Sequence, residues 1–134
     1  MSENPKTFYQ RELERLFQTL PLPEYRYAQI RQSKAFMKQY YSEKIELEKI
    51  AAAAFMSRFY YIKVFKQVYG VTPRQYLKDL RISEAKKLLK KGISVTQVCH
   101  DVGYQSLPTF SKAFKCGTGY SPKAYQNLNY NNLG

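Results

Sequence analysis

The chain has 134 residues, 44 % of them hydrophobic, which is enough for one domain with a modest core. Its formal net charge is +12, and positions 55–91 hold ten basic but only two acidic residues, a balance that favours a polyanionic partner. No apolar run approaches the roughly 20 residues that a membrane-spanning helix needs, and the first ten residues lack the pattern of a secretory signal, so we expect an intracellular, cytoplasmic protein without a membrane partner.

The first predicted helix lies in YQRELERLFQTL, at residues 9–20, and the breaker PLP follows it. Its apolar positions fall on one helical face; they are Leu13, Leu16, Phe17 and Leu20. We assign residues 1–26 to an N-terminal extension or interdomain linker that contains this one amphipathic helix. A second helix is expected over residues 24–41, with apolar positions that include Ile30, Phe36, Met37 and Tyr40.

Two shorter apolar patterns come next. ELEKIAAAAF, at residues 46–55, predicts a short helix, and RFYYIKVFKQVYG predicts another that ends at Gly70. Ser57 is placed to cap this second helix, because its side-chain oxygen can accept from an unpaired N–H of the first turn. The residues expected to be buried on it are Tyr61, Val64, Phe65 and Val68.

A longer basic helix is predicted over residues 73–91 and stops at Gly92. Thr72 is its expected N-cap, Pro73 fits the first helical position, and Gln75 would complete a capping box. At 1.5 Å per residue this helix spans roughly 28 Å. The positions expected to be buried are Tyr76 or Leu77, Leu80, Ala85, Leu88 and Leu89.

The last third of the chain repeats the pattern of a short helix and a second helix. Ser94 and Gln97 predict a capping box for a helix whose apolar face is Val95, Val98, Cys99 and Val102. Ser106 is the next N-cap candidate. Pro108 then falls in the first turn, where its missing N–H has no intrahelical partner to lose, so residues 106–116 can be helical with Phe110 and Phe114 buried. A short helix, PKAYQN, and a frayed tail over residues 128–134 complete the prediction.

Residues 46–66 and 94–115 therefore contain one unit twice: a short helix, a tight turn and a helix that ends in Phe-Lys. Ser57 corresponds to Ser106, and Phe65 corresponds to Phe114. This is the helix-turn-helix pattern. Because no alternating strand pattern occurs, we predict an all-α fold in which two helix-turn-helix subdomains, at about 46–69 and 94–117, are joined by the long linker helix.

In DNA-binding helix-turn-helix proteins the second helix lies in the major groove. The outward residues expected to meet base edges are Arg58, Phe59, Ile62 and Lys63 in the first unit and Leu107, Pro108, Ser111 and Lys112 in the second. The residues expected to contact phosphates are Ser57, Lys66, Ser106, Thr109 and Lys115. The linker helix is close to one DNA turn of about 34 Å, so one monomer is expected to suffice. In the alternative interpretation, the outward apolar residues pack on a neighbouring helix or partner.

Residues 42–127 resemble the DNA-binding domain of AraC-type transcriptional regulators. The matching segments are LEKIAAAAFMSRFYYIKVFKQVYGVTPRQYL, LRISEAKKLL and VTQVCHDVGYQSLPTFSKAFKCGTGYSPKAY. Residues 27–41 resemble the helix that opens this domain, so we assign it residues 27–127.

The resemblance implies bipartite recognition of double-stranded DNA and activation of transcription through RNA polymerase. It implies a buried, paired Arg81, with Asp79 or Asp101 as its expected partner. The residue pattern itself assigns structural roles to Phe65 and Phe114 as buried residues and to Gly103 as the end of the helix that follows Ser94. Most relatives carry a further effector-binding or dimerisation domain. The chain is thus either a stand-alone regulator or the C-terminal piece of a larger protein, in which case a dimer is possible.

Nothing in the sequence predicts catalysis. Cys99 lies on an apolar face and is expected to be a core thiol, and two cysteines with one histidine do not form a zinc site. We therefore expect no enzyme activity, no metal and no cofactor. The alternative function is an RNA-binding or protein-interaction module, because 13 tyrosines and 8 phenylalanines could stack on single strands. Basic, apolar and serine positions exposed together on both units would favour duplex DNA instead.

Overall fold

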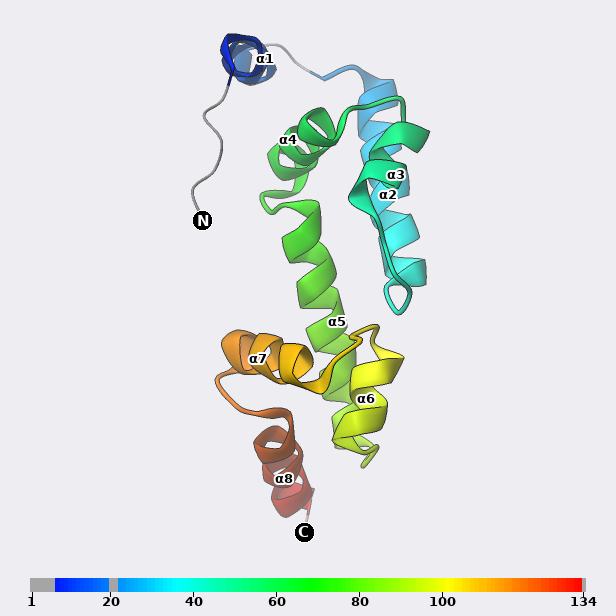
Figure 1. The fold of residues 1–134 in the computed structure, drawn as a ribbon, viewed down its shortest axis with the longest axis vertical. Helices are drawn as coiled ribbons and strands as arrows, with labels where there is room; N and C mark the ends of the chain where they lie inside the picture. The colour runs from blue at the N-terminus through cyan, green and yellow to red at the C-terminus, as the bar shows by residue number, and fades with distance from the viewer. Residues whose placement is uncertain (1–6, 20–21, 134) are drawn as a thin grey trace.

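The computed structural model describes residues 7–19 and 22–133. All regular secondary structure in this part of the chain is α-helical. The helices are α1 (Phe8–Thr19), α2 (Glu24–Tyr40), α3 (Leu47–Ala53), α4 (Arg58–Tyr69), α5 (Pro73–Lys90), α6 (Val95–Asp101), α7 (Leu107–Thr118) and α8 (Pro122–Leu133). In Figure 1, α5 runs along the long axis, with α2, α3 and α4 at its first half and α6, α7 and α8 at its second. The all-α fold with two helix-turn-helix subdomains is confirmed.

The predicted N-caps are confirmed at four helices. In each, a hydroxyl oxygen accepts from the backbone N–H three residues further on, at distances of 3.1–3.3 Å. The caps are Ser57 of α4, Thr72 of α5, Ser94 of α6 and Ser106 of α7. Pro108 lies in the first turn of α7, where no intrahelical bond is lost.

The second half of each predicted capping box is wrong. Nε2 of Gln75 donates to Oδ1 of Asp79 at 2.8 Å, and Nε2 of Gln97 donates to Oδ1 of Asp101 at 2.7 Å. Both glutamines therefore bind a carboxylate one turn ahead instead of the N-cap residue behind them. A charged acceptor makes the stronger hydrogen bond, and the i, i+4 spacing brings the two side chains together.

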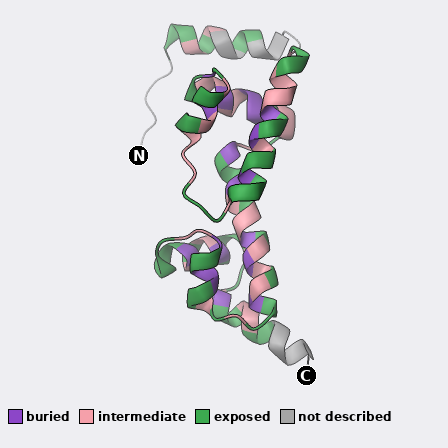
Figure 2. Ribbon diagram, turned by 90° about the vertical axis from the view of Figure 1, so that its right-hand side faces the viewer, coloured by how far each residue is buried: buried purple, intermediate pink, exposed green. Residues whose placement is uncertain are grey.

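Each subdomain has its own hydrophobic core, and Figure 2 shows the buried residues in two groups along the molecule. The first core consists of Ile30, Met37, Ala51, Met56, Tyr61, Val64, Phe65 and Leu77. The second consists of Ile82, Ala85, Leu89, Val98, Cys99, Val102, Phe110 and Phe114. The linker helix α5 contributes residues to both cores. Phe65 and Phe114, for which structural roles were predicted, are core residues.

Several sequence predictions need correction. Phe36 and Tyr40 of α2 are 46 % and 38 % exposed and contact each other at a ring-centroid distance of 4.8 Å. Ile82 is buried although the apolar pattern of α5 did not single it out, because the face of α5 that enters the second core is displaced from the one that enters the first. On α1, Leu16 is 43 % exposed, whereas the side chains of Leu13 and Phe17, and residue Leu20, lie outside the described residues.

Two helices are longer than predicted. α7 continues to Thr118, and its Gly117 packs beside Ile82 of α5, where an added Cβ would lie 3.7 Å from Cγ2. α8 continues to Leu133, through the segment that sequence analysis assigned to a frayed tail. No glycine or proline interrupts residues 123–133, so backbone hydrogen bonding can continue through them.

A buried hydroxyl pair connects α2 to α4. The hydroxyl of Tyr61 donates to Oγ of Ser33 at 2.9 Å, and Ser33 donates to the carbonyl oxygen of Ile30 at 2.8 Å. Burial raises the pKa of Tyr61 to about 12, from 10.0. Since the pKa is higher in the folded chain, the contribution of Tyr61 to stability is complete below pH 10 and disappears as the pH rises through about 12.

We expect Tyr61→Phe to cost about 1 kcal/mol at pH 7, because Ser33 loses a buried donor. The stability of the wild type should decline above pH 10 as Tyr61 ionises, by at most about 1.4 kcal/mol per pH unit for one group. The variant has no hydroxyl at this position, so its stability should decline less. Urea unfolding of both proteins at pH 7, 9.5 and 11 measures this difference. An identical decline in the variant would show that the Tyr61 hydroxyl does not contribute to it.

Candidate nucleic-acid interface

The second helices of the two units lie on one side of the linker helix. In Figure 1, α4 and α7 are to the left of α5, whereas α2, α3 and α6 are to its right. α4 is held by α2, α3 and α5, and α7 is held by α5, α6 and α8. Each presents one face to its core and leaves the opposite face toward solvent.

The predicted contact residues all lie outside the two cores. The exposed ones are Ser57, Arg58, Lys66, Ser106, Leu107, Pro108, Thr109, Lys112 and Lys115. The half-buried ones are Phe59, Ile62, Lys63 and Ser111. Basic, apolar and serine side chains thus share the outer face of both units, the combination that sequence analysis identified as favouring duplex DNA.

In the first unit, the outward charges already have neighbours. Nη1 of Arg58 lies 3.3 Å from Oε1 of Glu48 on α3. The ammonium of Lys63 lies 5.7 Å from the ring centroid of Phe59, within reach of a cation–π contact. Exposed ion pairs are worth about 0–1 kcal/mol, so Arg58 can exchange Glu48 for a nucleic-acid group at small cost.

In the second unit, two side-chain hydroxyls form hydrogen bonds at the N-terminus of α7. The hydroxyl of Ser106 accepts from the backbone N–H of Thr109 and donates to Oγ1 of Thr109 at 2.7 Å. The proton of the Thr109 hydroxyl is therefore directed away from Ser106. Such a donor at an exposed helix N-terminus suits a phosphate oxygen.

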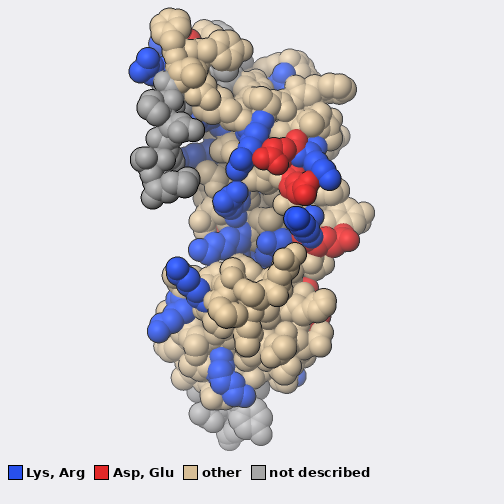
Figure 3. All heavy atoms as spheres, in the orientation of Figure 1, with Lys and Arg blue, Asp and Glu red and all other residues tan. Residues whose placement is uncertain are grey.

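Basic side chains gather on the face that carries α4 and α7. Figure 3 shows Lys and Arg at several heights down the left half of the molecule, whereas Asp and Glu gather at the upper right, where other Lys and Arg side chains lie beside them. A surface with an excess of one sign attracts a polyanion and gives it a preferred side of approach.

The two helix-turn-helix turns have the same backbone design but different residues. In the first, Phe55 N–H donates to Ala52 and Met56 N–H to Ala51; in the second, Gly103 donates to His100 and Tyr104 to Cys99. Gly103 has φ +97°, and its counterpart Phe55 has φ +57° with a side chain 90 % exposed. Sequence reasoning missed Phe55 because the second turn is one residue longer, which hides its correspondence with Gly103.

We expect Phe55→Gly to stabilise the chain by about 1 kcal/mol, because a side chain in the left-handed region costs about 1–2 kcal/mol and the exposed ring has little burial to lose. The midpoint of chemical unfolding measures the change. Phe55→Ala serves as control, since it removes the ring but keeps the strain. A Phe55→Gly variant no more stable than Phe55→Ala would contradict the strain assignment.

Arg81 is half-buried, but its predicted acidic partner is wrong. Its Nε donates to the carbonyl oxygen of Tyr41 at 2.8 Å, and its Nη2 donates to that of Glu43 at 3.0 Å. Asp79 and Asp101 instead accept from glutamines. Carbonyls at a helix C-terminus have no intrahelical donor, and the guanidinium fork satisfies two of them at once.

Cys99 belongs to the second core and not to the candidate interface. Cys99 is buried, as predicted; burial raises the pKa of its thiol, and Sγ lies 3.7 Å from the carbonyl oxygen of Tyr104. Within the described residues, no three His, Cys, Asp or Glu side chains converge as a metal site would require. The same part of the chain contains no helix with the length and hydropathy to cross a membrane.

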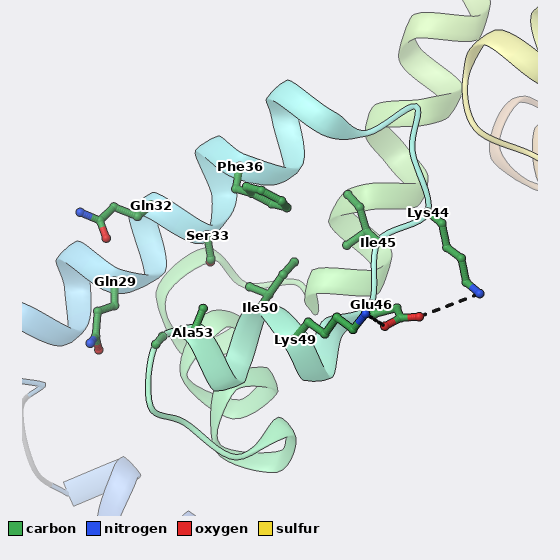
Figure 4. Close-up of a pocket in the computed structure, with 11 residues that line it drawn as sticks. Gln29, Gln32, Ser33, Phe36, Lys44, Ile45, Glu46, Lys49, Ile50 and Ala53 are labelled. Atoms are coloured by element: carbon green, nitrogen blue, oxygen red, sulfur yellow. Dashed lines mark ion pairs between the residues drawn. The ribbon is translucent and has the colours of Figure 1, made fainter.

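A groove of about 610 Å³ lies between α2 and α3. Figure 4 shows Phe36, Ile45 and Ile50 on its walls, and at one end Glu46, which pairs with Lys49 at 3.1 Å and Lys44 at 3.9 Å. No lining residue comes from α4 or α7, so the groove is separate from the candidate interface.

Comparisons with known proteins identify the kind of domain that this chain contains. A family model described as a helix-turn-helix domain matches residues 50–128. The uncharacterized HTH-type transcriptional regulator YobQ of Bacillus subtilis (strain 168) is 32 % identical over 97 residues, which cover 72 % of this chain and 40 % of YobQ. The MmsAB operon regulatory protein of Pseudomonas aeruginosa is 36 % identical over 93 residues, 69 % of this chain and 30 % of that protein.

A solved structure is similar as well. The DNA-binding domain of AdpA, a global transcriptional factor crystallised in complex with a target DNA, superposes with a TM-score of 0.70 at 29 % identity, over 74 % of this chain and 90 % of that one. This chain spans 40 % or less of the two curated relatives but most of the isolated domain.

Proposed function

This chain belongs to the AraC-type helix-turn-helix family of transcriptional regulators, and we propose that its α4 and α7 read two successive major grooves of one DNA duplex. The family is one of DNA-binding regulators rather than of enzymes. We therefore propose double-stranded DNA as the partner, and the manner of reading is part of the same proposal.

The observation that carries the proposal is the placement of α4 and α7 on one side of α5. The 18 residues of α5 span about 27 Å, and successive major grooves on one face of a duplex are about 34 Å apart. Two reading helices held at the two ends of such a linker can enter both grooves from one side. One chain then suffices.

The side chains divide into two roles. Lys63 and Lys112 would donate to guanine O6 or N7, and Ser111 to either kind of base group. The apolar Phe59, Ile62, Leu107 and Pro108 would meet thymine methyl groups. Phosphates would be held by the exposed Lys66 and Lys115 and by the hydroxyl of Thr109, and these contacts add affinity without sequence information.

We propose further that the bound chain activates transcription through contact with RNA polymerase. Support for this step is the family resemblance, together with surfaces on α2, α3 and α6 that face away from α4 and α7. The alternative of a single-strand stacking module is less well supported. Among the side chains that the structure describes, the exposed tyrosines are Tyr9, Tyr25, Tyr40 and Tyr120, and none belongs to α4 or α7.

Selection from a pool of random duplex DNA at two salt concentrations tests the proposal. We expect two short motifs, enriched together at one spacing of about one helical turn, and one chain per duplex by sedimentation. Salt should weaken binding to every sequence, because phosphate contacts release counterions. Salt-sensitive binding that enriches no motif would reject sequence reading and leave only a basic surface.

A further inference from the structure

The loop between α2 and α3, residues 41–46, touches both subdomains. It follows α2 in the first unit, yet Tyr41 packs against the second core as well as the first. Burial and the nearby carboxylate of Glu84 raise the pKa of Tyr41. Tyr41 is therefore a packing contact between the first unit's loop and both cores.

Arg81 fastens this loop to the middle of the linker helix. Its two hydrogen bonds, to the carbonyl oxygens of Tyr41 and Glu43, hold the loop from one side. On the other side its guanidinium lies 5.8 Å from the ring centroid of Tyr104, in the turn of the second unit. Arg81 thus lies between the loop of the first unit and the turn of the second.

Gly103 brings the two units into direct backbone contact. A Cβ on this residue would lie 2.9 Å from the carbonyl oxygens of both Tyr41 and Ser42. Atoms that close must move apart, and both are backbone atoms that cannot rotate away. Only glycine, which also tolerates the φ of +97°, lets the turn of the second unit rest against the loop.

The contact continues to the reading helix of the second unit. The ring of Tyr104 packs on Phe110 of α7 at a centroid distance of 5.4 Å. A cleft of about 560 Å³ at this junction is lined by the loop, by Arg81 and by Leu107, the first residue of α7. The turn that rests on the loop of the first unit therefore leads directly into α7.

We propose that the loop at residues 41–43, Arg81 and Gly103 form a clamp that fixes the separation of α4 and α7, and so sets the half-site spacing that the chain accepts. This inference rests on the proposed bipartite reading of DNA. If the linker helix α5 were the only connection, the two units could rotate relative to each other about its axis. The clamp adds a second connection, away from that axis. Arg81 and Gly103 are positioning residues and contact no base.

Two variants open the clamp by different routes, and each has a matched control. Arg81→Lys keeps the charge but loses the two-pronged geometry. Gly103→Ala introduces the close contact with the loop. Gly92→Ala is its control, because Gly92 has a similar φ of +86° but no atom within 4 Å of an added Cβ. Circular dichroism and thermal unfolding establish that each variant is folded.

The first readout is affinity for duplexes whose two half-sites are moved apart or together by one and two base pairs. We expect wild type and Gly92→Ala to favour one spacing. In Arg81→Lys and Gly103→Ala the preference for that spacing should fall by about tenfold, which corresponds to about 1.4 kcal/mol of coupling. Unchanged preferences in both folded variants would overturn the clamp.

A second readout does not depend on DNA. Spin labels at Ala52→Cys and Ala124→Cys, two exposed sites in different units, in a Cys116→Ser background, report the distance between the units. We expect one narrow distribution in wild type and Gly92→Ala, and a broadened or displaced one in the two clamp variants. Identical distributions would also overturn the clamp. If the distances change but wild type reads no paired motif, the proposed function fails while the clamp stands.

Discussion

Replacement of Phe65 or Phe114 by alanine is expected to destabilise the chain by about 3–5 kcal/mol, the usual cost of truncating a buried aromatic ring. Both rings are fully buried, and they occupy corresponding positions in the two units. Phe65 contacts Tyr61, Tyr69 and Tyr76, and Phe114 contacts Phe110 and Tyr125. Each loss would leave a cavity between several rings that cannot close it.

Urea unfolding measures this effect. Phe55→Ala is the matched control, because that ring is 90 % exposed and should contribute almost nothing by burial. Where the alanine variants do not fold, Phe65→Leu and Phe114→Leu keep part of the volume and should still lose more stability than Phe55→Ala. Equal losses at the three positions would contradict the assignment of two cores.

Lys63→Ala and Lys112→Ala are each expected to remove sequence preference at a different half-site. A good side-chain contact to a base is worth about 1–3 kcal/mol, so affinity for the paired site should fall by about 5–150-fold. Selection with each variant should return one motif unchanged and the other relaxed. The two defects should add in the double variant, since they act on separate grooves.

Two other lysines separate base contacts from phosphate contacts. Lys66→Ala should weaken binding to all sequences about equally and lower the salt slope by about 1. Lys123→Ala, an exposed lysine on α8, should change little. If Lys63→Ala and Lys112→Ala weakened all duplexes equally and relaxed no position, these side chains would be phosphate contacts.

Much of the fold could be predicted because local signals and periodicity agree in this sequence. Hydroxyl caps at Ser57, Thr72, Ser94 and Ser106 mark four helix starts, and the duplicated Phe-Lys ends reveal the two units. Outward positions on α4 and α7 follow from the helical period alone. These features depend on residues close together in the chain.

Two of the predictions that fell short concern contacts between distant segments. Arg81 binds carbonyls 38 and 40 residues earlier in the chain, and a sequence pattern shows side chains but not which backbone oxygens are left unpaired. Gly103 was expected only to end a helix, yet it also admits the loop of the other unit. The position of Phe55 could not be recognised from the sequence, because only the backbone hydrogen bonds of the two turns show that Phe55 corresponds to Gly103.

The most direct test of bipartite reading is the affinity of one chain for two duplexes that differ only in the distance between the selected half-sites. In the first, the half-site centres lie about one helical turn apart, near 10–10.5 base pairs. In the second, the half-site centres lie about five base pairs further apart, so that one of the two major grooves faces the opposite side of the duplex. We predict a one-to-one complex with the first and at least about tenfold weaker binding to the second. Equal affinities, or a requirement for two chains on the first duplex, would contradict the reading of successive grooves by one chain.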